Sequence, residues 1–362
     1  MKIGGLDLRK SGLRLDHVHL VSPYSKMEFA YKQPKHQDWF DVKVGNVRLN
    51  DVDIPGYFST KELRVGGLWI NDVLLQNLKN RKIPVEPHIV PMIYEGLQKA
   101  PVRFKIDTAS VANFSVVYEE LPVKGDKLGK LGKLYFTDMN GQFSGLTNIV
   151  SYPEQFITLH ADGNLMGSGH FTATWQLPVD SLYDRFLLDA RLDSLDLLSL
   201  NEIIKPLAPA EVTSGWAQDV VFHMDASSRK GRIRLDFPYR KLKVALLKEK
   251  DGETTQKGFL SRLANLVLRD NNPAHPERKD SKLRKVDMEI VRDPYHSTFN
   301  YLWQMLRPAL VESVGVSKKE QDAALKVAGF FTKVKRFFGL DKKKDKREEI
   351  DTNNKEIEPL KE

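Results

Sequence analysis

The sequence predicts a mainly β protein, because two kinds of repetition run along the chain. Apolar residues alternate with polar ones through most of its length, and this period of two is typical of half-buried strands. The phrase VGNVRLNDVDI, which begins at Val44, also returns as VGGLWINDVLL from Val65, 21 residues later. Recurring short strands of this kind favour a β-meander or a β-solenoid that grows rung by rung.

In both copies the alternation changes parity twice, and each change coincides with a pair of glycine, asparagine or aspartate residues. These residue types accept positive φ angles, which tight turns and β-bulges require. The pairs are Gly45-Asn46 and Asn50-Asp51 in the first copy, and Gly66-Gly67 and Asn71-Asp72 in the second. We therefore predict short strands joined by minimal turns or interrupted by bulges, and no ligand bound by these pairs.

The organisation of the chain is predicted from changes in this pattern. The expected segments are residues 1–83 as repeated β rungs, 84–100 as a short helical insertion, 101–252 as the main sheet region with a short helix near 196–205, 253–315 as a final strand and an amphipathic helix, 316–340 as a basic amphipathic helix, and 341–362 as a disordered charged tail. The tail assignment rests on high charge without apolar spacing.

Spacing and capping signals predict the two earlier helices. Ile89, Ile93 and Leu97 recur at helical spacing after a proline-rich entry. Further along, Asp196 is the expected N-cap of a short helix that Pro206 ends.

An amphipathic helix is also predicted near residue 300, where Ser297 or Thr298 provides a cap. One stripe of this helix is expected to hold Phe299, Leu302, Trp303, Leu306 and Leu310. Just before it, FLSRLANLVL fits either a helix or a buried strand, and KLRKVDMEIVRD fits one more strand.

Composition excludes several classes of protein. Hydrophobic residues make up 41% and charged residues 29%, values that fit neither a disordered chain nor a multi-spanning membrane protein. The absence of cysteine rules out disulfides, thiolate metal sites and cysteine nucleophiles. No apolar run reaches the roughly 20 residues of a membrane-spanning helix, and no signal-peptide run follows Met1. We expect the natural protein to carry an N-terminal anchor upstream of this sequence.

Residues that carry chemistry occur without the spacing that catalysis needs. Asp189 and Asp193 alternate with apolar residues and are expected to face solvent, and His17 with His19 lacks a third metal ligand of obvious spacing. The glycines from Gly163 to Gly169 do not have dinucleotide-loop spacing and lead into a strand. We predict no enzyme activity, no catalytic residue, no metal and no cofactor.

The net charge of +8 gathers near the C-terminus, where lysines alternate with phenylalanines. Two interpretations stay open: contact with an anionic membrane surface, or a solvated helix packed on the sheet. Nucleic acid is attracted by the same charge but is not an expected partner. The residues expected to contact a membrane or a protein partner are Trp303, Phe331, Lys335 and Phe338.

Several phrases in succession resemble a known family. They are FKIDTASVANFSVVYEE, FLLDARLDSLDLLSLNEIIKPLAPAEVTSG, KGRIRLDFPYRKLKVALL and STFNYLWQMLRPAL. Together they resemble the AsmA-like envelope proteins of the Bacteroidetes type, which are related to TamB. The resemblance extends from about Arg103 to Gly315 and depends on the order of loose apolar patterns.

The resemblance implies a long, strongly curved, taco-like β-sheet with an apolar groove. It also implies a periplasmic protein, anchored in the inner membrane, that binds or conducts phospholipid and supports outer-membrane biogenesis. The groove candidates are Val47, Leu49, Leu68, Ile70, Phe114, Val116, Phe171 and Trp175. The alternative is a structural β-protein whose C-terminal helices dock an outer-membrane assembly protein. An enzyme acting on envelope glycan is a more distant third.

Overall fold

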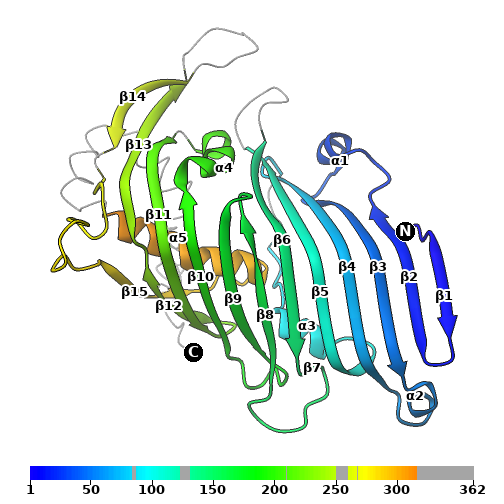
Figure 1. Ribbon diagram of the computed structural model, residues 1–362. Helices are drawn as coiled ribbons and strands as arrows, with labels where there is room; N and C mark the ends of the chain where they lie inside the picture. The colour runs from blue at the N-terminus through cyan, green and yellow to red at the C-terminus, as the bar shows by residue number, and fades with distance from the viewer. Residues whose placement is uncertain (84–86, 123–130, 209, 250–259, 267, 316–362) are drawn as a thin grey trace, which may run out of the picture. The chain divides into compact units, whose positions relative to one another are not determined.

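A computed structural model describes residues 1–83, 87–122, 131–208, 210–249, 260–266 and 268–315. It confirms a mainly β fold, in which one large, open and curved sheet of 15 strands is accompanied by a few short helices (Figure 1). The strands are β1 (Gly5–Arg9), β2 (Gly12–Val21), β3 (Trp39–Val52), β4 (Glu62–Asn80), β5 (Arg103–Leu121), β6 (Gly132–Ser144), β7 (Leu146–Thr147), β8 (Phe156–Leu165), β9 (Gly169–Pro178), β10 (Phe186–Asp196), β11 (Ala210–Ala226), β12 (Lys230–Asp236), β13 (Tyr239–Glu249), β14 (Leu260–Leu266) and β15 (Lys285–Val291).

The strands follow the chain order of a meander. The order across the sheet is β1-β2-β3-β4-β5-β6-β8-β9-β10-β11-β12-β15, while β13 pairs with β11 and β14, and β7 pairs with β5. The two ends of this order, β1 and β15, do not meet, so the sheet stays open. β12 and β13 share one edge of β11: residues 221–226 of β11 pair with β12, and residues 210–217 pair with β13.

The two copies of the repeat lie in the long neighbouring strands β3 and β4. The expectation of short strands joined by minimal turns is wrong, because each strand passes through its parity changes without ending. The copies run antiparallel, with Val44 opposite Val73 and Val47 opposite Ile70. What separates the short alternating runs is therefore an irregularity inside each strand.

We call one line of these irregularities the crease, defined by His17, Gly45, Asp72, Asn113 and Asp138 on β2 to β6. His17, Asp72, Asn113 and Asp138 have φ angles of 51° to 57°, a left-handed conformation that Asn, Asp and His adopt more readily than other non-glycine residues. Gly45 lies against this line, because a Cβ there would come within 2.8 Å of the Asp72 Cβ. The crease flips parity in several strands together, so the apolar side chains on both sides of it face the same way.

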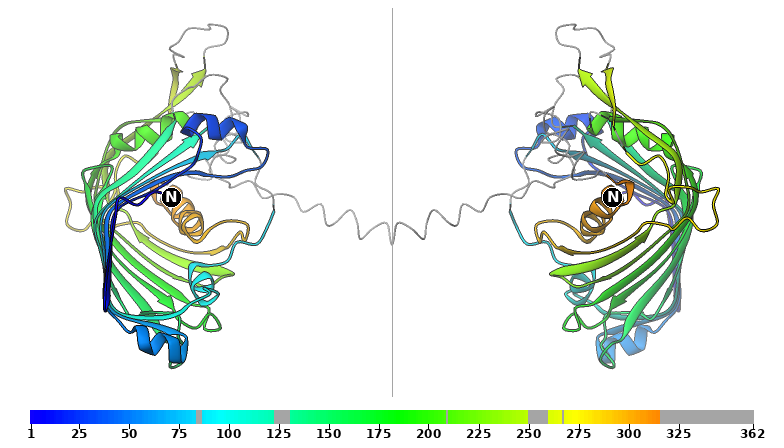
Figure 2. Two further views of the ribbon diagram at one scale, coloured as in Figure 1. Left: turned by 90° about the vertical axis from the view of Figure 1, so that its right-hand side faces the viewer. Right: turned by 90° about the vertical axis from the view of Figure 1, so that its left-hand side faces the viewer.

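One connection leaves the meander and crosses the sheet. β4 and β5 are parallel, so the chain from Arg81 to Val102 has to return from one end of the sheet to the other. The returning segment is tied to the loop before the last helix: Arg292 Nη2 donates to the Val90 carbonyl at 2.6 Å, and the Ile93 amide donates to Thr298 Oγ1 at 3.1 Å. Figure 2 shows this segment passing on the hollow side of the sheet.

The helices are α1 (Lys26–Lys32), α2 (Ile54–Thr60), α3 (Ile93–Gln98), the 3₁₀ turn η1 (Leu197–Leu200), α4 (Asn201–Leu207) and α5 (Thr298–Val314). The expected Asp196 and Ser297 caps are confirmed, since their side chains accept from the Leu198 and Asn300 amides. The predicted insertion is shorter than expected: Ile89 precedes α3 and is 74% exposed. Pro206 lies inside α4 and does not end it.

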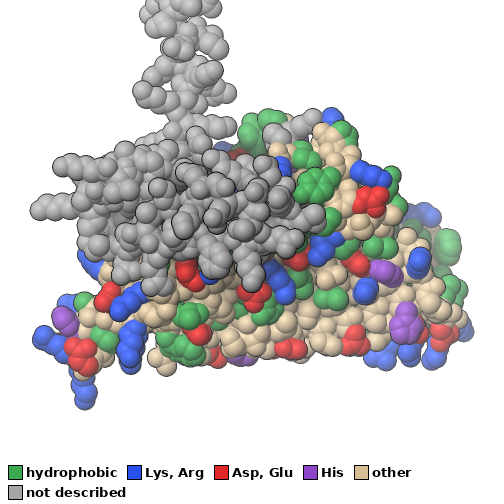
Figure 3. Space-filling model, turned by 90° about the horizontal axis from the view of Figure 1, so that it is seen from above, with side chains coloured by type: hydrophobic (Ala, Val, Ile, Leu, Met, Phe, Trp, Pro, Cys, Tyr) green, Lys and Arg blue, Asp and Glu red, His purple; other side chains and the backbone are tan. Residues whose placement is uncertain are grey.

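The convex face of the sheet carries ion pairs between neighbouring strands. On β12 and β15, Arg232 pairs with Asp287 at 2.6 Å and Lys230 with Glu289 at 2.9 Å. Figure 3, which looks down on the upper edge of the molecule, shows basic and acidic side chains interspersed along the described surface. Exposed pairs of this kind contribute little stability each, about 0 to 1 kcal/mol, but they keep this face hydrated.

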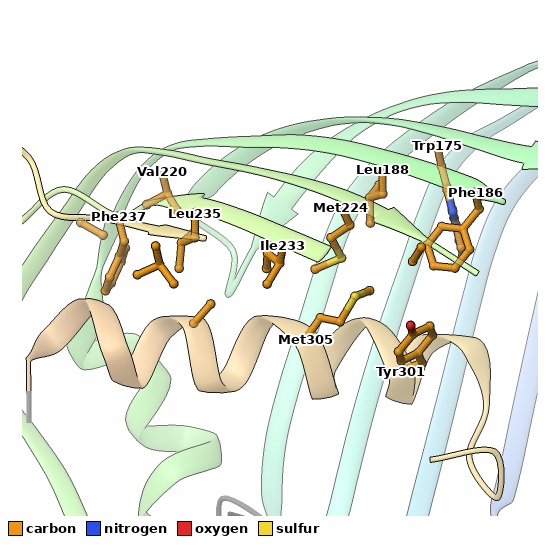
Figure 4. Close-up of a cluster of buried hydrophobic side chains, with 14 of the residues drawn as sticks. Trp175, Phe186, Leu188, Val220, Met224, Ile233, Leu235, Phe237, Tyr301 and Met305 are labelled. Atoms are coloured by element: carbon orange, nitrogen blue, oxygen red, sulfur yellow. The ribbon is translucent and has the colours of Figure 1, made fainter. Parts of the chain in front are cut away.

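The main core lies between the C-terminal half of the sheet and α5. The sheet residues Phe186, Met224 and Ile233 point toward the helix, and Tyr301 and Met305 of the helix pack against them (Figure 4). All five side chains are essentially buried. A fully buried apolar side chain contributes about 1.5–3 kcal/mol, so this cluster is the main stabilising element of the described chain.

The predicted basic helix and charged tail fall outside the described residues, which end at Gly315. Phe331, Lys335 and Phe338, the expected contact residues in that segment, are therefore not placed.

Candidate functional site

All eight predicted groove residues lie on one face of the sheet. Directly paired residues of neighbouring strands point the same way, and the registers connect the candidates: Val47 with Ile70, Leu49 with Leu68, and Val116 with Phe136 of β6. The Phe136 ring in turn contacts Phe171, with centroids 5.8 Å apart. We call this the concave face, because it is the face toward which α5 lies (Figure 2).

From β1 to β6 the concave face is apolar and partly open to solvent. Its members are Leu6 and Leu8, Leu13, Leu15, Val18 and Leu20, Val42, Val44, Val47 and Leu49, Leu68, Ile70, Val73 and Leu75, Val111, Phe114 and Val116, and Leu134, Phe136, Met139 and Phe143. Most are half-buried, and Leu6 and Leu8 remain 67% and 73% exposed. We call this part the open wall. Contiguous exposed apolar surface is typical of a binding site.

From β8 to β15 the same face is covered by α5. Trp175 is a groove candidate but is only 8% exposed, and its ring contacts Phe186 and Phe299. The structure thus separates the candidates into two groups. Trp175 belongs to the packed core, and the remaining seven are half-buried and lie on or beside the open wall.

The helix stripe predicted to be apolar packs on the core only in part, since Leu302, Leu306 and Leu310 are partly buried against it. The buried residues of α5 are Thr298, Tyr301, Met305, Ala309 and Ser313. Phe299 and Trp303, which belong to the predicted stripe, are 65% and 46% exposed. Because both sides of the helix carry apolar residues, spacing alone could not decide which side faces the sheet.

The apolar concave face ends in polar residues at the same level on β4 and β5. Leu75 is opposite Val116, the next concave pair is Asn77 with Tyr118, and the one after is Lys79 with Glu120. The change from apolar to polar therefore occurs across neighbouring strands together. A wall with one polar end matches an amphipathic molecule better than a purely apolar one.

Arg81 and Arg307 add positive charge near this polar end. Arg81 pairs with Glu120 at 3.0 Å, and the other oxygen of that carboxylate accepts from the Tyr118 hydroxyl at 2.7 Å. Burial, followed by the charge of Glu120, raises the pKa of Tyr118, which keeps the hydroxyl a donor. Burial and the charge of Arg81 lower the pKa of Arg307. We call Lys79, Arg81 and Arg307 the basic rim.

Sequence reasoning missed the basic rim. A signal for Arg307 was present, since QMLRPAL places one charge inside an apolar helical segment. The signal for Arg81 and Lys79 was weaker, because basic residues at the end of a strand are common on ordinary surfaces. Arg81 directly follows β4 and lies far from α5 in the sequence, so only the folded chain brings its charge near Arg307.

Most predicted chemistry residues form simple surface pairs. Asp189 and Asp193 are exposed, as expected, and pair with His223 at 2.7 Å and His170 at 2.9 Å. His19 pairs with Asp41 at 2.8 Å. Within the described segments, no group of three or more His, Asp or Glu side chains is placed to share a metal ion.

Two further observations bear on the class of protein. Of the helices among the described residues, none combines the length and the apolar character that crossing a bilayer requires. A scan of protein-family models and a search of curated proteins found no match to the chain. These comparisons give no support to the resemblance to AsmA-like proteins, and the concave face is the feature of the described chain that bears on function.

Proposed function

We propose that this protein binds phospholipid on the concave face of its sheet and conducts it along that face. In this proposal it is a non-enzymatic envelope protein of the AsmA-like type. It acts in the periplasm, is held at the inner membrane by an anchor in the full-length protein, and supports outer-membrane biogenesis.

The observation that carries the proposal is the continuity of the open wall. Alternation alone would turn the apolar side chains to the other face at each parity change, yet the left-handed residues of the crease return them to the concave face. A packed core under α5 does not need this in β2 to β5, since α5 lies closest to β12 and β15. The crease thus maintains apolar surface where the described chain provides no cover for it.

The energetics favour such a surface for lipid. Exposing an acyl chain to water costs a free energy of about 0.8 kcal/mol per CH₂ group, so a sixteen-carbon chain costs roughly 12 kcal/mol. A half-buried apolar wall removes a large part of this cost because the chain leaves water as it moves. Hydrophobic contact is non-directional, which suits movement along the wall.

The second candidate function is a structural protein that docks an outer-membrane assembly partner. The exposed aromatic side chains of Phe299 and Trp303 on α5 favour it, because aromatic side chains are enriched at protein interfaces. In this case the helix that closes half of the concave face also presents the docking surface. Loss of lipid binding and loss of partner binding would then follow from changes on different elements.

The proposal is tested by replacing Ile70 with lysine and measuring bound phospholipid. Ile70→Lys places a charge on the open wall, where it lowers the affinity for an acyl chain. Ser110→Lys is the matched control, since Ser110 is opposite Trp69 on the convex side of the neighbouring strand. After gentle purification, native mass spectrometry counts the lipid molecules carried by each protein.

We expect phospholipid on the unaltered protein and on Ser110→Lys, and at least ten-fold less on Ile70→Lys. Circular dichroism and thermal unfolding establish that both variants fold. The proposal is wrong if the unaltered protein carries no lipid, or if the two folded variants carry equal amounts.

A further inference from the structure

We propose that Arg307 and Arg81 bind the phosphate group of a lipid whose acyl chains lie on the open wall. This inference rests on the proposed function and goes further by naming the residues that bind the headgroup. It predicts a protein that distinguishes phosphate-bearing lipids from neutral lipids with the same acyl chains.

Arg307 is a half-buried cation without an anion. Its neighbours Met305 and Ala309 are fully buried against the sheet, and a residue between them on an α-helix points to the opposite side. Its Nε is buried and donates no hydrogen bond. Among the described residues no carboxylate contacts it, and the charge that acts on it most is the positive one of Arg81.

An unpartnered guanidinium in this position is costly. Removing a charge from water without pairing it costs several kcal/mol, so buried arginines are normally paired. In the buried Arg292 the Nε also lacks a partner, but its two terminal nitrogens donate to the carbonyls of Val90, Ser228 and His296. Arg307 lacks such partners, which points to an anion supplied from outside the chain.

Arg81 is positioned to share that anion. One oxygen of Glu120 pairs with the Arg81 guanidinium at 3.0 Å, and the other oxygen accepts a hydrogen bond from the Tyr118 hydroxyl. Two carboxylates act here, Glu120 and Asp38, whose charges add to burial in raising the pKa of Tyr118. They face three basic side chains, because Lys79 follows Asn77 along the same side of β4 and joins Arg81 and Arg307. The local excess is positive. Guanidinium groups bind phosphate oxygens through paired, charge-assisted hydrogen bonds.

The order of residues along the wall matches the order of groups in a phospholipid. The apolar pairs Val73 with Phe114 and Leu75 with Val116 come first, followed by the polar pair Asn77 with Tyr118. The basic rim comes next. A fatty ester or a hydrocarbon would use only the first part of this series, whereas a phospholipid uses all of it.

The test compares two lipids that differ only in phosphate. Dioleoyl phosphatidate and dioleoylglycerol are presented in the same detergent micelles, and native mass spectrometry gives the dissociation constant of each. We expect the unaltered protein to bind the phosphatidate at least ten-fold more tightly. Arg307→Gln and Arg81→Gln should each remove about ten-fold of this preference while leaving dioleoylglycerol binding unchanged.

Two further variants separate charge from geometry. Arg48→Gln removes an exposed arginine on the convex side of β3 and should leave both affinities unchanged. Arg307→Lys keeps the charge but not the paired donors, so it should retain part of the preference. Melting temperatures establish that each variant folds, and we expect Arg307→Gln to be no less stable than the unaltered protein.

The outcomes distinguish this inference from the proposed function. Equal affinity of the unaltered protein for the two lipids, or equal loss of both lipids in Arg307→Gln, overturns the headgroup site while lipid binding stands. Binding of neither lipid overturns the proposed function itself. If glycerol 3-phosphate alone binds as tightly as the phosphatidate, the site takes a soluble phosphate and the inference is wrong.

Discussion

The two halves of the sheet share an alternating pattern of apolar and polar residues, but their concave side chains differ in how far they are buried. On the open wall, concave residues such as Ile70 are half-buried, and Leu8 is 73% exposed. On β10 and β12, Leu188 is 7% exposed and Ile233 is fully buried. Leu8 and Ile233 differ most in exposure, yet each has a charged residue on either side in the sequence.

The difference comes from the elements that cover the strands and not from the strands themselves. Tyr301, Met305 and Ala309 of α5, with Met92 and Tyr94 of the crossover, belong to the buried cluster that includes β10 and β12. A strand supplies an apolar face, but whether that face becomes core or surface depends on an element encoded far along the chain. The comparison teaches that a period-two pattern by itself does not separate a core from a binding wall.

The largest effect expected is loss of stability at the covered half. Phe186 is fully buried, and its ring contacts Trp175 and Tyr301 with centroids 6.3 and 6.2 Å apart. Phe186→Ala should lower the free energy of unfolding by about 3–5 kcal/mol, through lost burial and a cavity. Urea unfolding followed by circular dichroism measures the change.

The matched substitution on the open wall is Ile70→Ala. Because Ile70 is half-buried in the folded protein, we expect a loss of only about 1 kcal/mol. Equal losses for the two variants would show that the open wall is as well packed as the core.

An intermediate effect is expected where the sheet and α5 approach most closely. A Cβ on Gly231 would lie 2.5 Å from the Ala226 Cβ and 2.6 Å from the Met305 sulfur. Gly231→Val should therefore force α5 away from the sheet and cost about 1–3 kcal/mol. Hydrogen exchange should become faster in residues 298–314.

Gly96→Ala is the control for this substitution, because a Cβ on Gly96 meets no atom within 4 Å. It should be neutral or slightly stabilising, as expected when alanine replaces glycine in a helix. Unchanged exchange in α5 of Gly231→Val would contradict the close fit.

The smallest effect concerns pH. On the convex side of the covered half, Arg185 donates to both oxygens of Asp225 at 3.0 and 2.9 Å and lowers the pKa of that carboxyl. The stabilisation is therefore present above the ordinary aspartate pKa and is lost as pH falls through the lower folded value. Since both side chains are more than a third exposed, we expect about 0.5 kcal/mol.

Comparing Asp225→Asn with the unaltered protein by urea unfolding at pH 7 and pH 3 measures this contribution. The difference in stability between the two proteins should be present at pH 7, smaller at pH 3, and weakened by 1 M salt. A difference that grows on acidification would contradict the sign of the pKa shift.

The candidate site could be predicted only in part. Alternation and the positions of its parity changes placed seven candidates on or beside the open wall, because period two is a local property of the backbone. Trp175 has the same pattern but is buried against Phe186 and Phe299, and Arg81 and Arg307 come near each other only in the folded chain. Contacts between distant segments leave no periodic signal in the sequence.

Two short helices, α1 and α2, were not predicted from the sequence although capping signals for both are present. Ser25 followed by Glu28 is a capping signature for α1, and Asp53 before Pro55 is one for α2. Both helices are short, and the strong alternation around them outweighed these signals. The Asp53 side chain does accept from the Gly56 amide at 2.8 Å.

The sequence by itself determined the β class, the apolar stripe of each strand, the positions where that stripe changes parity, and the C-terminal helix with a cap at Ser297 or Thr298. Each of these follows from neighbours within a few residues. The tertiary structure alone decided that the parity changes align into a crease, which side of α5 faces the sheet, and where the apolar wall stays open. Those features depend on the register between strands and on the packing of α5, and neither is encoded in any short segment.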